Sequence, residues 1–328
     1  MRGNDGARRI LQGSGVNATA EPDGRTLHYG HFYGVLPDES DDRPLAVVWG
    51  NCQAEATRLM LESAGAPWRS VRVPPVHELT DDDIPHVRKL FDAVDVLISQ
   101  PVRDGYRELP IGTSDVIEMA TPSLTVVRWP VFRYGGLFPF QLIVRDPDDP
   151  SADPPGVPYH DLRTVIAARD GASVDDEWDV DLTPEMIRSA SERSVTELRR
   201  REERDTDVAI SDVLVDAGAG VAHTINHPGN TVLATLAERI LAAYGAESTR
   251  PTADHDLLGE VRSPVEQRVL DAFDLDAPAR DEWLVGDDTV AQRDIAEQQL
   301  RWYAERPAVV DAALERYAEL IDLFGLAR

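Results

Sequence analysis

The stretch Pro44-Leu-Ala-Val-Val-Trp-Gly-Asn-Cys-Gln53 decides the fold of this chain of 328 residues. Its apolar part, residues 45–49, is short and continuous, which is typical of a strand buried on both faces in a parallel sheet. A Gly-Asn pair then permits a sharp turn. Apolar residues recur at helical spacing after Cys52, at Ala56, Leu59, Met60 and Ala64. The pattern therefore predicts a strand, a tight turn and a helix, in that order.

The only cysteine of the chain, Cys52, falls at the start of that predicted helix. Unpaired N–H groups and the positive end of the helix dipole favour a thiolate and a developing oxyanion there. The C-terminal ends of parallel strands are also where open α/β sheets bind their ligands. A lone cysteine is otherwise most often a small buried hydrophobe. The position of Cys52 favours a nucleophile, provided that the chain also supplies a base.

Composition excludes several classes of protein. The net charge of −26 disfavours binding to nucleic acid or to anionic lipid, because both need a basic surface. No apolar run is long enough to span a membrane, and the N-terminus lacks the apolar segment of a signal peptide. One cysteine suits a reducing compartment, and Lys89 is the only lysine. We expect a cytoplasmic protein without membrane insertion, whose acidic runs are solvated surface rather than metal sites.

Apolar runs alternate with helical patterns beyond the opening unit. We expect further strands at residues 71–73, 94–98 and 124–129, with helices from Thr80 to residue 91 and over residues 114–120. Such alternation indicates a parallel sheet covered by helices on both faces. A long loop rich in aromatic residues and glycine, residues 130–140, follows the last of these strands, where functional loops are common.

Three regions are expected along the chain. Residues 1–40 read as a poorly ordered N-terminal arm, and residues 41–274 as an α/β domain with a helical insertion at about 146–205. Residues 275–328 read as a helical C-terminal extension. Further helices are predicted at residues 159–170, 183–205, 288–304 and 307–325, and in the segment after residue 230.

The best candidate for a base is His227, in the sequence Asn226-His227-Pro228 directly before a predicted helix. A histidine in this position is more often a packed or capping residue. A thiol nucleophile needs a nearby base, however, and Cys52 and His227 are the two best-placed residues of the chain. His223 is a competitor.

These motifs together resemble a known family. Gly50-Asn-Cys-Gln53 at a strand end, Ser99-Gln100-Pro101 after a later strand and Asn226-His227-Pro228 before a helix are similar to those of the WcbI-type family. Its members are regarded as coenzyme A-binding acetyltransferases of capsule polysaccharide biosynthesis. Their layout resembles that of the SGNH (GDSL-type) hydrolases, with cysteine in place of serine. The resemblance spans about residues 44–275 and implies a three-layer α/β fold with a parallel sheet, of SGNH-like or flavodoxin-like layout, followed by the helical extension.

The resemblance also implies roles for individual residues. By position, Cys52 corresponds to the nucleophile or acyl-contacting residue, and His227 to its base. Polar groups around the reacting carbonyl would come from Asn51, Gln53, Gln100 and Asn226. Two departures stand out: Thr224 occupies the place of the aspartate of SGNH enzymes, and Gly136-Leu-Phe-Pro139 stands where the family tends to carry Gly-aromatic-His-Pro.

Coenzyme A or acetyl-coenzyme A as co-substrate is implied by the resemblance alone, because the chain has no glycine-rich phosphate loop. Arginines in or beside the strand-end loops are candidates for holding phosphates, although a surface salt bridge is the more common explanation for any one of them. Aromatic residues of the 130–140 loop either stack on an adenine or a sugar or pack beneath the loop. The expected cofactor contacts are Arg133, Arg128, Arg103 and Tyr134; further candidates are Arg58, Arg107, Trp129 and Phe132.

The expected function is acyl transfer, most simply of acetyl, from acetyl-coenzyme A to a sugar hydroxyl in polysaccharide or glycoconjugate biosynthesis. The partners would then be a small acyl donor and a sugar or glycan acceptor. Two alternatives stay open: a cysteine-dependent esterase or thioesterase, and a non-catalytic module that binds a nucleotide or sugar.

Overall fold

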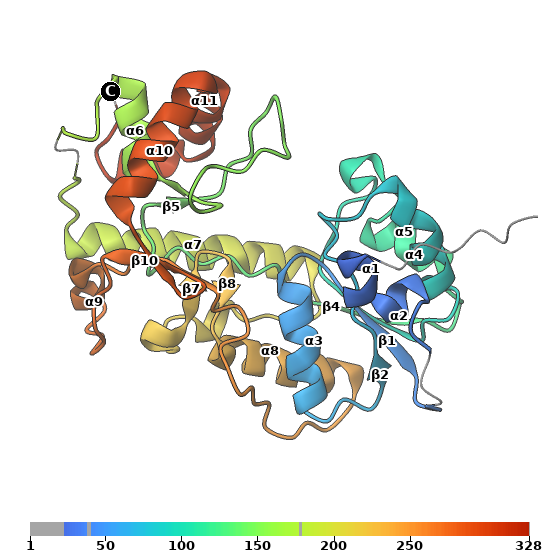
Figure 1. Cartoon of the computed structure of the whole chain (residues 1–328). Helices are drawn as coiled ribbons and strands as arrows, with labels where there is room; N and C mark the ends of the chain where they lie inside the picture. The colour runs from blue at the N-terminus through green and yellow to red at the C-terminus, as the bar shows by residue number, and fades with distance from the viewer. Residues whose placement is uncertain (1–22, 38–40, 177–178, 328) are drawn as a thin grey trace, which may run out of the picture.

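A parallel sheet of four strands lies at the centre of the protein (Figure 1). The computed structural model describes residues 23–37, 41–176 and 179–327. The strand order is β2-β1-β3-β4, and every neighbouring pair is parallel. The strands are β1 (Leu45–Trp49), β2 (Arg69–Ser70), β3 (Val96–Ser99) and β4 (Thr125–Arg128). The structure thus confirms the α/β class and the parallel sheet.

Strand β1 is buried on both faces, and its side chains alternate between two hydrophobic cores. Ala46 and Val48 belong to the core that also contains residues of α3 and α8. Leu45, Val47 and Trp49 belong to the core that contains residues of α4 and α5. Figure 1 shows these two pairs of helices on opposite sides of the sheet, which gives three layers. The helices are α3 (Gln53–Ser63), α4 (Ile84–Phe91), α5 (Thr113–Met119) and α8 (Asn230–Tyr244).

The rest of the described chain surrounds these layers. A long helix, α7, joins the sheet region to a second group of helices near the C-terminus (Figure 1). The remaining helices are α1 (Gly24–His28), α2 (Gly30–Tyr33), α6 (Leu162–Asp170), α7 (Pro184–Asp205), α9 (Gln267–Ala272), α10 (Gln292–Glu305), α11 (Pro307–Arg316) and α12 (Ala318–Leu323). The remaining strands are β5 (Gln141–Leu142), β6 (His160–Asp161), β7 (Ala222–Thr224), β8 (His227–Pro228), β9 (Val261–Arg262), β10 (Glu282–Val285) and β11 (Asp288–Ala291). No helix in the described ranges is both long and apolar enough to cross a lipid bilayer.

Two expected elements differ in the structure. The strand predicted at residues 71–73 lies instead at residues 69–70, because the chain leaves the sheet edge before Pro74-Pro75. The helix predicted to begin at residue 288 begins at Gln292. Residues 288–291 form β11, which pairs antiparallel with β10 across a turn where Gly286 has φ +59°. Residues on both sides of that turn follow a strand pattern, which the sequence analysis interpreted as the start of a helix.

The ends of the chain also pack differently from a simple arm and tail. Residues 23–37 form two short helices, and Phe32 is buried in the same core as α4. The first 22 residues of the expected arm lie outside the described residues. Helices α10 and α11 pack against α6, so the C-terminal extension covers the inserted helices of the middle of the chain.

The turn after β1 depends on the absence of a side chain at Gly50. A Cβ built there would lie 2.5 Å from Oε1 of Gln100, which accepts a hydrogen bond from the Asn51 N–H at 2.9 Å. The Gln100 side chain is 1% exposed, and its Nε2 donates to Gln53 at 3.0 Å. Any movement that makes room for a Cβ therefore breaks buried hydrogen bonds.

We expect Gly50→Ala to lower the free energy of unfolding by about 1–3 kcal/mol, the cost of leaving a buried polar group unpaired. The measurement is a urea titration followed by circular dichroism. Gly220→Ala is the control, because a Cβ at Gly220 would have no atom within 4 Å and its φ is not positive. Equal unfolding midpoints for the two variants would contradict this account of the turn.

Candidate active site

The structure brings Cys52 and His227 together. Cys52 is the N-cap residue of α3, directly after β1, and His227 begins the short strand β8 ahead of α8. The Sγ atom of Cys52 lies 3.7 Å from Nε2 of His227, although 175 residues separate them in sequence. β8 lies outside the parallel sheet; the packing of α3 against α8 and the hydrogen bond from Gln53 to the Asn226 carbonyl bring the histidine to the end of β1. The predicted proximity of the two side chains is confirmed.

Desolvation leaves this half-buried pair uncharged. Desolvation raises the pKa of the Cys52 thiol to about 11, although the backbone N–H groups at the helix start oppose this shift. The pKa of His227 is lowered to about 4. Desolvation is the main cause, and the neighbouring His223 adds a smaller effect. At neutral pH the thiol is therefore protonated and the imidazole neutral. The expectation of a thiolate at the helix N-terminus was wrong, because removal from water outweighs the helix end.

No carboxylate in the described ranges orients His227. Among the described residues, its Nδ1 has no hydrogen-bond partner of good geometry, although a contribution from the Leu258 backbone partly opposes the lowering of the His227 pKa. Thr224, at the position of the SGNH aspartate, instead hydrogen-bonds to the hydroxyl of Tyr159 at 3.0 Å and donates to Oδ1 of Asn226 at 3.2 Å. Cys52 and His227 thus form a pair without an acidic third member in the described residues.

Tyr159 supports the histidine in place of an acid. Its ring meets the His227 ring edge to face with centroids 6.3 Å apart, and it stacks on Trp283 at 5.7 Å. Its hydroxyl donates to Oδ1 of Asn226 at 2.8 Å. Tyr159 follows a proline-rich segment far from either motif, and no spacing in the sequence marked it as part of the site.

The two glutamines of the motifs are internal supports. The Gln53 amide is fully occupied, because Nε2 donates to the carbonyls of Phe132 (3.0 Å) and Asn226 (2.7 Å), and Oε1 accepts from the Phe132 N–H (3.0 Å) and from Gln100 (3.0 Å). Gln53 is 0% exposed. Both glutamines therefore position the strand-end loops, which differs from the expected contact with a reacting carbonyl.

Three donors remain for a developing oxyanion. The Cys52 N–H has no acceptor among the described residues, and covalent geometry keeps it next to the thiol. Asn51 uses its Oδ1 to accept from the Gln53 N–H at 2.9 Å, and Asn226 uses its Oδ1 for Tyr159 and Thr224. Each asparagine is half-buried and keeps its NH₂ group uncommitted within the described part of the chain.

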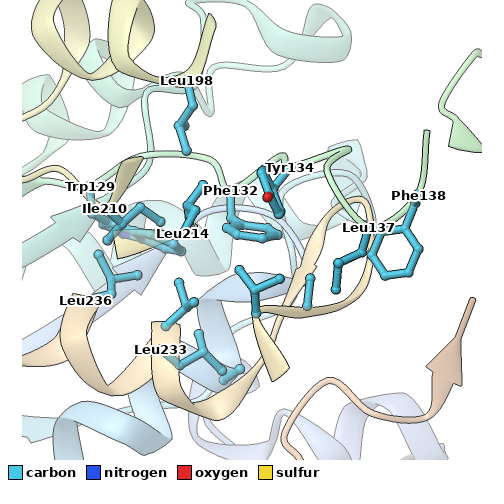
Figure 2. Close-up of a cluster of buried hydrophobic side chains, with 14 of the residues drawn as sticks. Trp129, Phe132, Tyr134, Leu137, Phe138, Leu198, Ile210, Leu214, Leu233 and Leu236 are labelled. Carbon is cyan, nitrogen blue, oxygen red and sulfur yellow. The ribbon is translucent and has the colours of Figure 1, made fainter. Parts of the chain in front are cut away.

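The loop of residues 129–140 packs the core instead of offering aromatic faces to a ligand. Trp129, Phe132 and Tyr134 are each at most 3% exposed and lie among side chains of α7 and α8 (Figure 2). The Tyr134 hydroxyl hydrogen-bonds to Oγ of Ser191 at 3.0 Å. Tyr134 was therefore wrongly expected to stack on a cofactor, because the apolar loop is buried beneath α7.

The candidate arginines are dispersed. Arg58 is paired with Glu55 and Glu62, Arg103 is exposed beside the Tyr106 ring, and Arg107 donates to the His77 carbonyl. Arg128 is half-buried next to Asp207, whose carboxylate accepts from its backbone N–H. Of the four expected cofactor contacts, Arg133 alone lines a large cavity with a volume of about 1170 Å³.

That cavity is adjacent to the Cys52–His227 pair without including it. Neither Cys52 nor His227 lines it, but Pro101 and Ile225 do, next in sequence to Gln100 and Asn226. The described residues contain no group of three or more His, Cys, Asp or Glu side chains placed to hold a metal ion.

Comparisons with known proteins agree with this architecture. A family model described as "Polysaccharide biosynthesis enzyme WcbI" matches residues 45–249. Among solved structures, the chain is similar to WcbI, described as a novel polysaccharide biosynthesis enzyme, in a native form without a disulfide bond between coenzyme A and a cysteine. The TM-score is 0.67 at 20% sequence identity, over 87% of this chain and 99% of that chain, which shows a shared fold. The search of curated proteins found no match.

The neutral state of the pair predicts how Cys52 reacts. We expect iodoacetamide to alkylate native Cys52 at pH 7 on the order of 100-fold more slowly than a free thiol, because the thiolate fraction falls as the pKa rises. The rate should climb with pH up to the pKa of about 11, without a plateau near neutrality. Labelling is followed by mass spectrometry, and the single cysteine leaves no background. The urea-unfolded chain is the control; a neutral-pH plateau in the folded protein would show a standing thiolate.

Proposed function

This chain belongs to the WcbI family of polysaccharide-biosynthesis enzymes, and from that premise we propose that it transfers an acyl group from a coenzyme A thioester to a sugar hydroxyl. The proposed acyl group is acetyl, carried by acetyl-coenzyme A. The observation that carries the proposal is the 3.7 Å approach of Cys52 Sγ to His227 Nε2 at the end of β1. A thiol beside an unprotonated imidazole is the minimum needed for acyl transfer through a covalent intermediate.

The first half-reaction exchanges one thioester for another. The neutral Nε2 of His227 takes the thiol proton while Sγ of Cys52 bonds to the acyl carbon. The bond from that carbon to the sulfur of coenzyme A then breaks, and the departing sulfur receives the proton from His227. The products are free coenzyme A and an S-acyl Cys52, and the exchange is nearly balanced in energy because a thioester replaces a thioester.

The second half-reaction repeats the same proton movements. His227 removes the proton of the acceptor hydroxyl as its oxygen bonds to the acyl carbon, and the carbon–sulfur bond to Cys52 breaks. The proton returns to the cysteine sulfur, which restores the neutral pair. The products are the O-acyl sugar and the starting enzyme.

The pKa values require the proton to move together with bond formation. A thiol with a pKa of about 11 does not ionise spontaneously towards an imidazole with a pKa of about 4. The transition state therefore depends on stabilising the oxyanion, and each preformed donor typically contributes about 3 kcal/mol. The Cys52 N–H is the first of these donors in the proposal, with the NH₂ groups of Asn51 and Asn226 as the others.

The acyl-enzyme is the direct test. After incubation with acetyl-coenzyme A, intact-mass measurement should show one added acetyl group on the wild-type protein and none on Cys52→Ala. In His227→Gln, the rate of acylation should fall by about 10²–10⁴-fold, the usual contribution of a general base. His255→Gln is the control, because His255 is exposed and its side chain is bonded only to Asp254.

The fate of the acyl group then separates transfer from hydrolysis. Release of the acetyl group that speeds up in the presence of a sugar acceptor, with an O-acetyl sugar as product, supports the proposal. Release at the same rate in water alone points to a thioesterase. An unmodified Cys52 together with tight binding of coenzyme A would indicate the binding module.

A further inference from the structure

The cavity of about 1170 Å³ that Arg133 lines contains an unusual concentration of arginine. It lies between the loop after β4, helix α7 from Ser189 to Asp205, and the segment from Arg316 to Leu323. Its charged lining comprises the basic residues Arg133, Arg193, Arg200, Arg201, Arg204 and Arg316, and the acidic residues Glu192, Glu197, Asp205 and Glu319. Arginine therefore prevails here in a protein whose net charge is −26.

Half of these arginines are neutralised by neighbouring carboxylates. Arg204 lies 2.7 Å from Asp205 and Arg200 lies 3.5 Å from Glu197. Arg193 pairs with Glu319. The fourth carboxylate of the lining, Glu192, is exposed on α7 and forms no ion pair within the described residues.

The other three arginines have no carboxylate partner in the described part of the chain. Arg133 is half-buried and makes no hydrogen bond there. Arg201, also half-buried, donates only to backbone carbonyls, those of Val131 at 3.2 Å and Glu197 at 3.4 Å. Arg316 lies beside the ring of Tyr317.

Two like charges, those of exposed Arg316 and half-buried Arg201, act on Arg133, while the carboxylates of Glu197, Glu202 and Asp205 offset part of the positive charge at Arg201. Burial lowers the pKa of Arg133, and the positive charges of Arg316 and Arg201 lower it further. Burial also lowers the pKa of Arg201. Placing like charges in one partly desolvated space costs free energy unless an anion offsets it. A bound anion would receive charge-assisted hydrogen bonds from guanidinium groups that have no carboxylate partner in the described residues.

A buried amide adds an uncharged donor to the same cavity. Gln141 lines it and is 7% exposed. Its Oε1 accepts from the Ile225 N–H at 2.9 Å, whereas its Nε2 is buried with no partner in the described residues. An unpaired buried donor is costly, and a ligand oxygen would satisfy it.

We propose that this cavity is a binding site for a phosphate-bearing ligand, held by Arg133, Arg201 and Arg316. Its volume of about 1170 Å³ is large enough for a nucleotide or sugar carrying a diphosphate. Under the proposed function two sources share this chemistry: the phosphorylated end of coenzyme A and a diphosphate-linked sugar acceptor. Phosphate binding itself does not depend on the proposed acyl transfer.

Inorganic pyrophosphate is the first probe, measured by isothermal titration calorimetry at fixed salt. Arg133→Gln and Arg201→Gln should each weaken its binding at least about tenfold, the effect of losing a charge-assisted hydrogen bond. Arg200→Gln is the matched control: it lines the same cavity but is paired with Glu197, so its affinity should stay within about twofold of wild type. Arg133→Lys keeps the charge, and unfolding midpoints of all variants verify that they fold.

The proposal is overturned if pyrophosphate does not bind, or if folded Arg133→Gln and Arg201→Gln bind it as wild type does. An equal loss in Arg200→Gln also overturns it, because that result indicates only a diffuse positive field. Cys52→Ala should bind pyrophosphate normally, so failure of acyl transfer and failure of this site can be told apart.

Two further titrations identify the source of the phosphate. If Arg133→Gln weakens binding of coenzyme A but not of pantetheine, which lacks phosphates, the acyl donor occupies the cavity. If it weakens binding of a nucleoside diphosphate sugar such as UDP-glucose and leaves coenzyme A unaffected, the acceptor does. Either result supports the site.

Discussion

The site depends on the hydrogen bonds of the buried Gln53 side chain. Its four hydrogen bonds join the start of α3 to the loop after β4, to the segment before His227 and, through Gln100, to the end of β3. Gln100 in turn accepts from the Asn51 N–H and needs the space that Gly50 leaves empty. One buried amide thus fixes the mutual position of strand ends that are distant in sequence. A glutamine suits this task because it offers two donors and two acceptors without a charge to desolvate.

The desolvation of Cys52 and His227 determines how the proposed chemistry operates. The environment that holds Cys52 and His227 in contact also removes their charges, so the pair rests as thiol and imidazole. An orienting carboxylate would favour a charged histidine, and none is bonded to it in the described ranges. Tyr159 and Thr224 occupy that space with uncharged groups. The proposed chemistry therefore suits activated acyl donors, such as thioesters, better than unactivated esters or amides.

The sequence predicted local features better than distant ones. The strand, turn and helix around Cys52 were predictable because apolar runs, glycine and helical spacing act within a few residues. The contact with His227 was predicted, but the packing of α8 against α3, and not a strand of the parallel sheet, brings the histidine there. The state of the thiol was predicted wrongly, since a helix end is visible in the sequence and desolvation is not. Tyr159, Arg201 and Arg316 were missed because only the packing of α7 and of the C-terminal segment brings them near the strand-end loops.

The separation of 175 residues between Cys52 and His227 has a consequence during synthesis of the protein on the ribosome. A ribosome adding about 5–20 residues per second needs roughly 9–35 s to reach the histidine after the cysteine has been made. During that interval the helix that begins at Cys52 lacks α8 and the loops that shield the thiol. The nascent chain thus carries its single sulfhydryl without protection until two-thirds of its length exists. An oxidant present during that interval would therefore meet a thiol that is less shielded than in the folded protein.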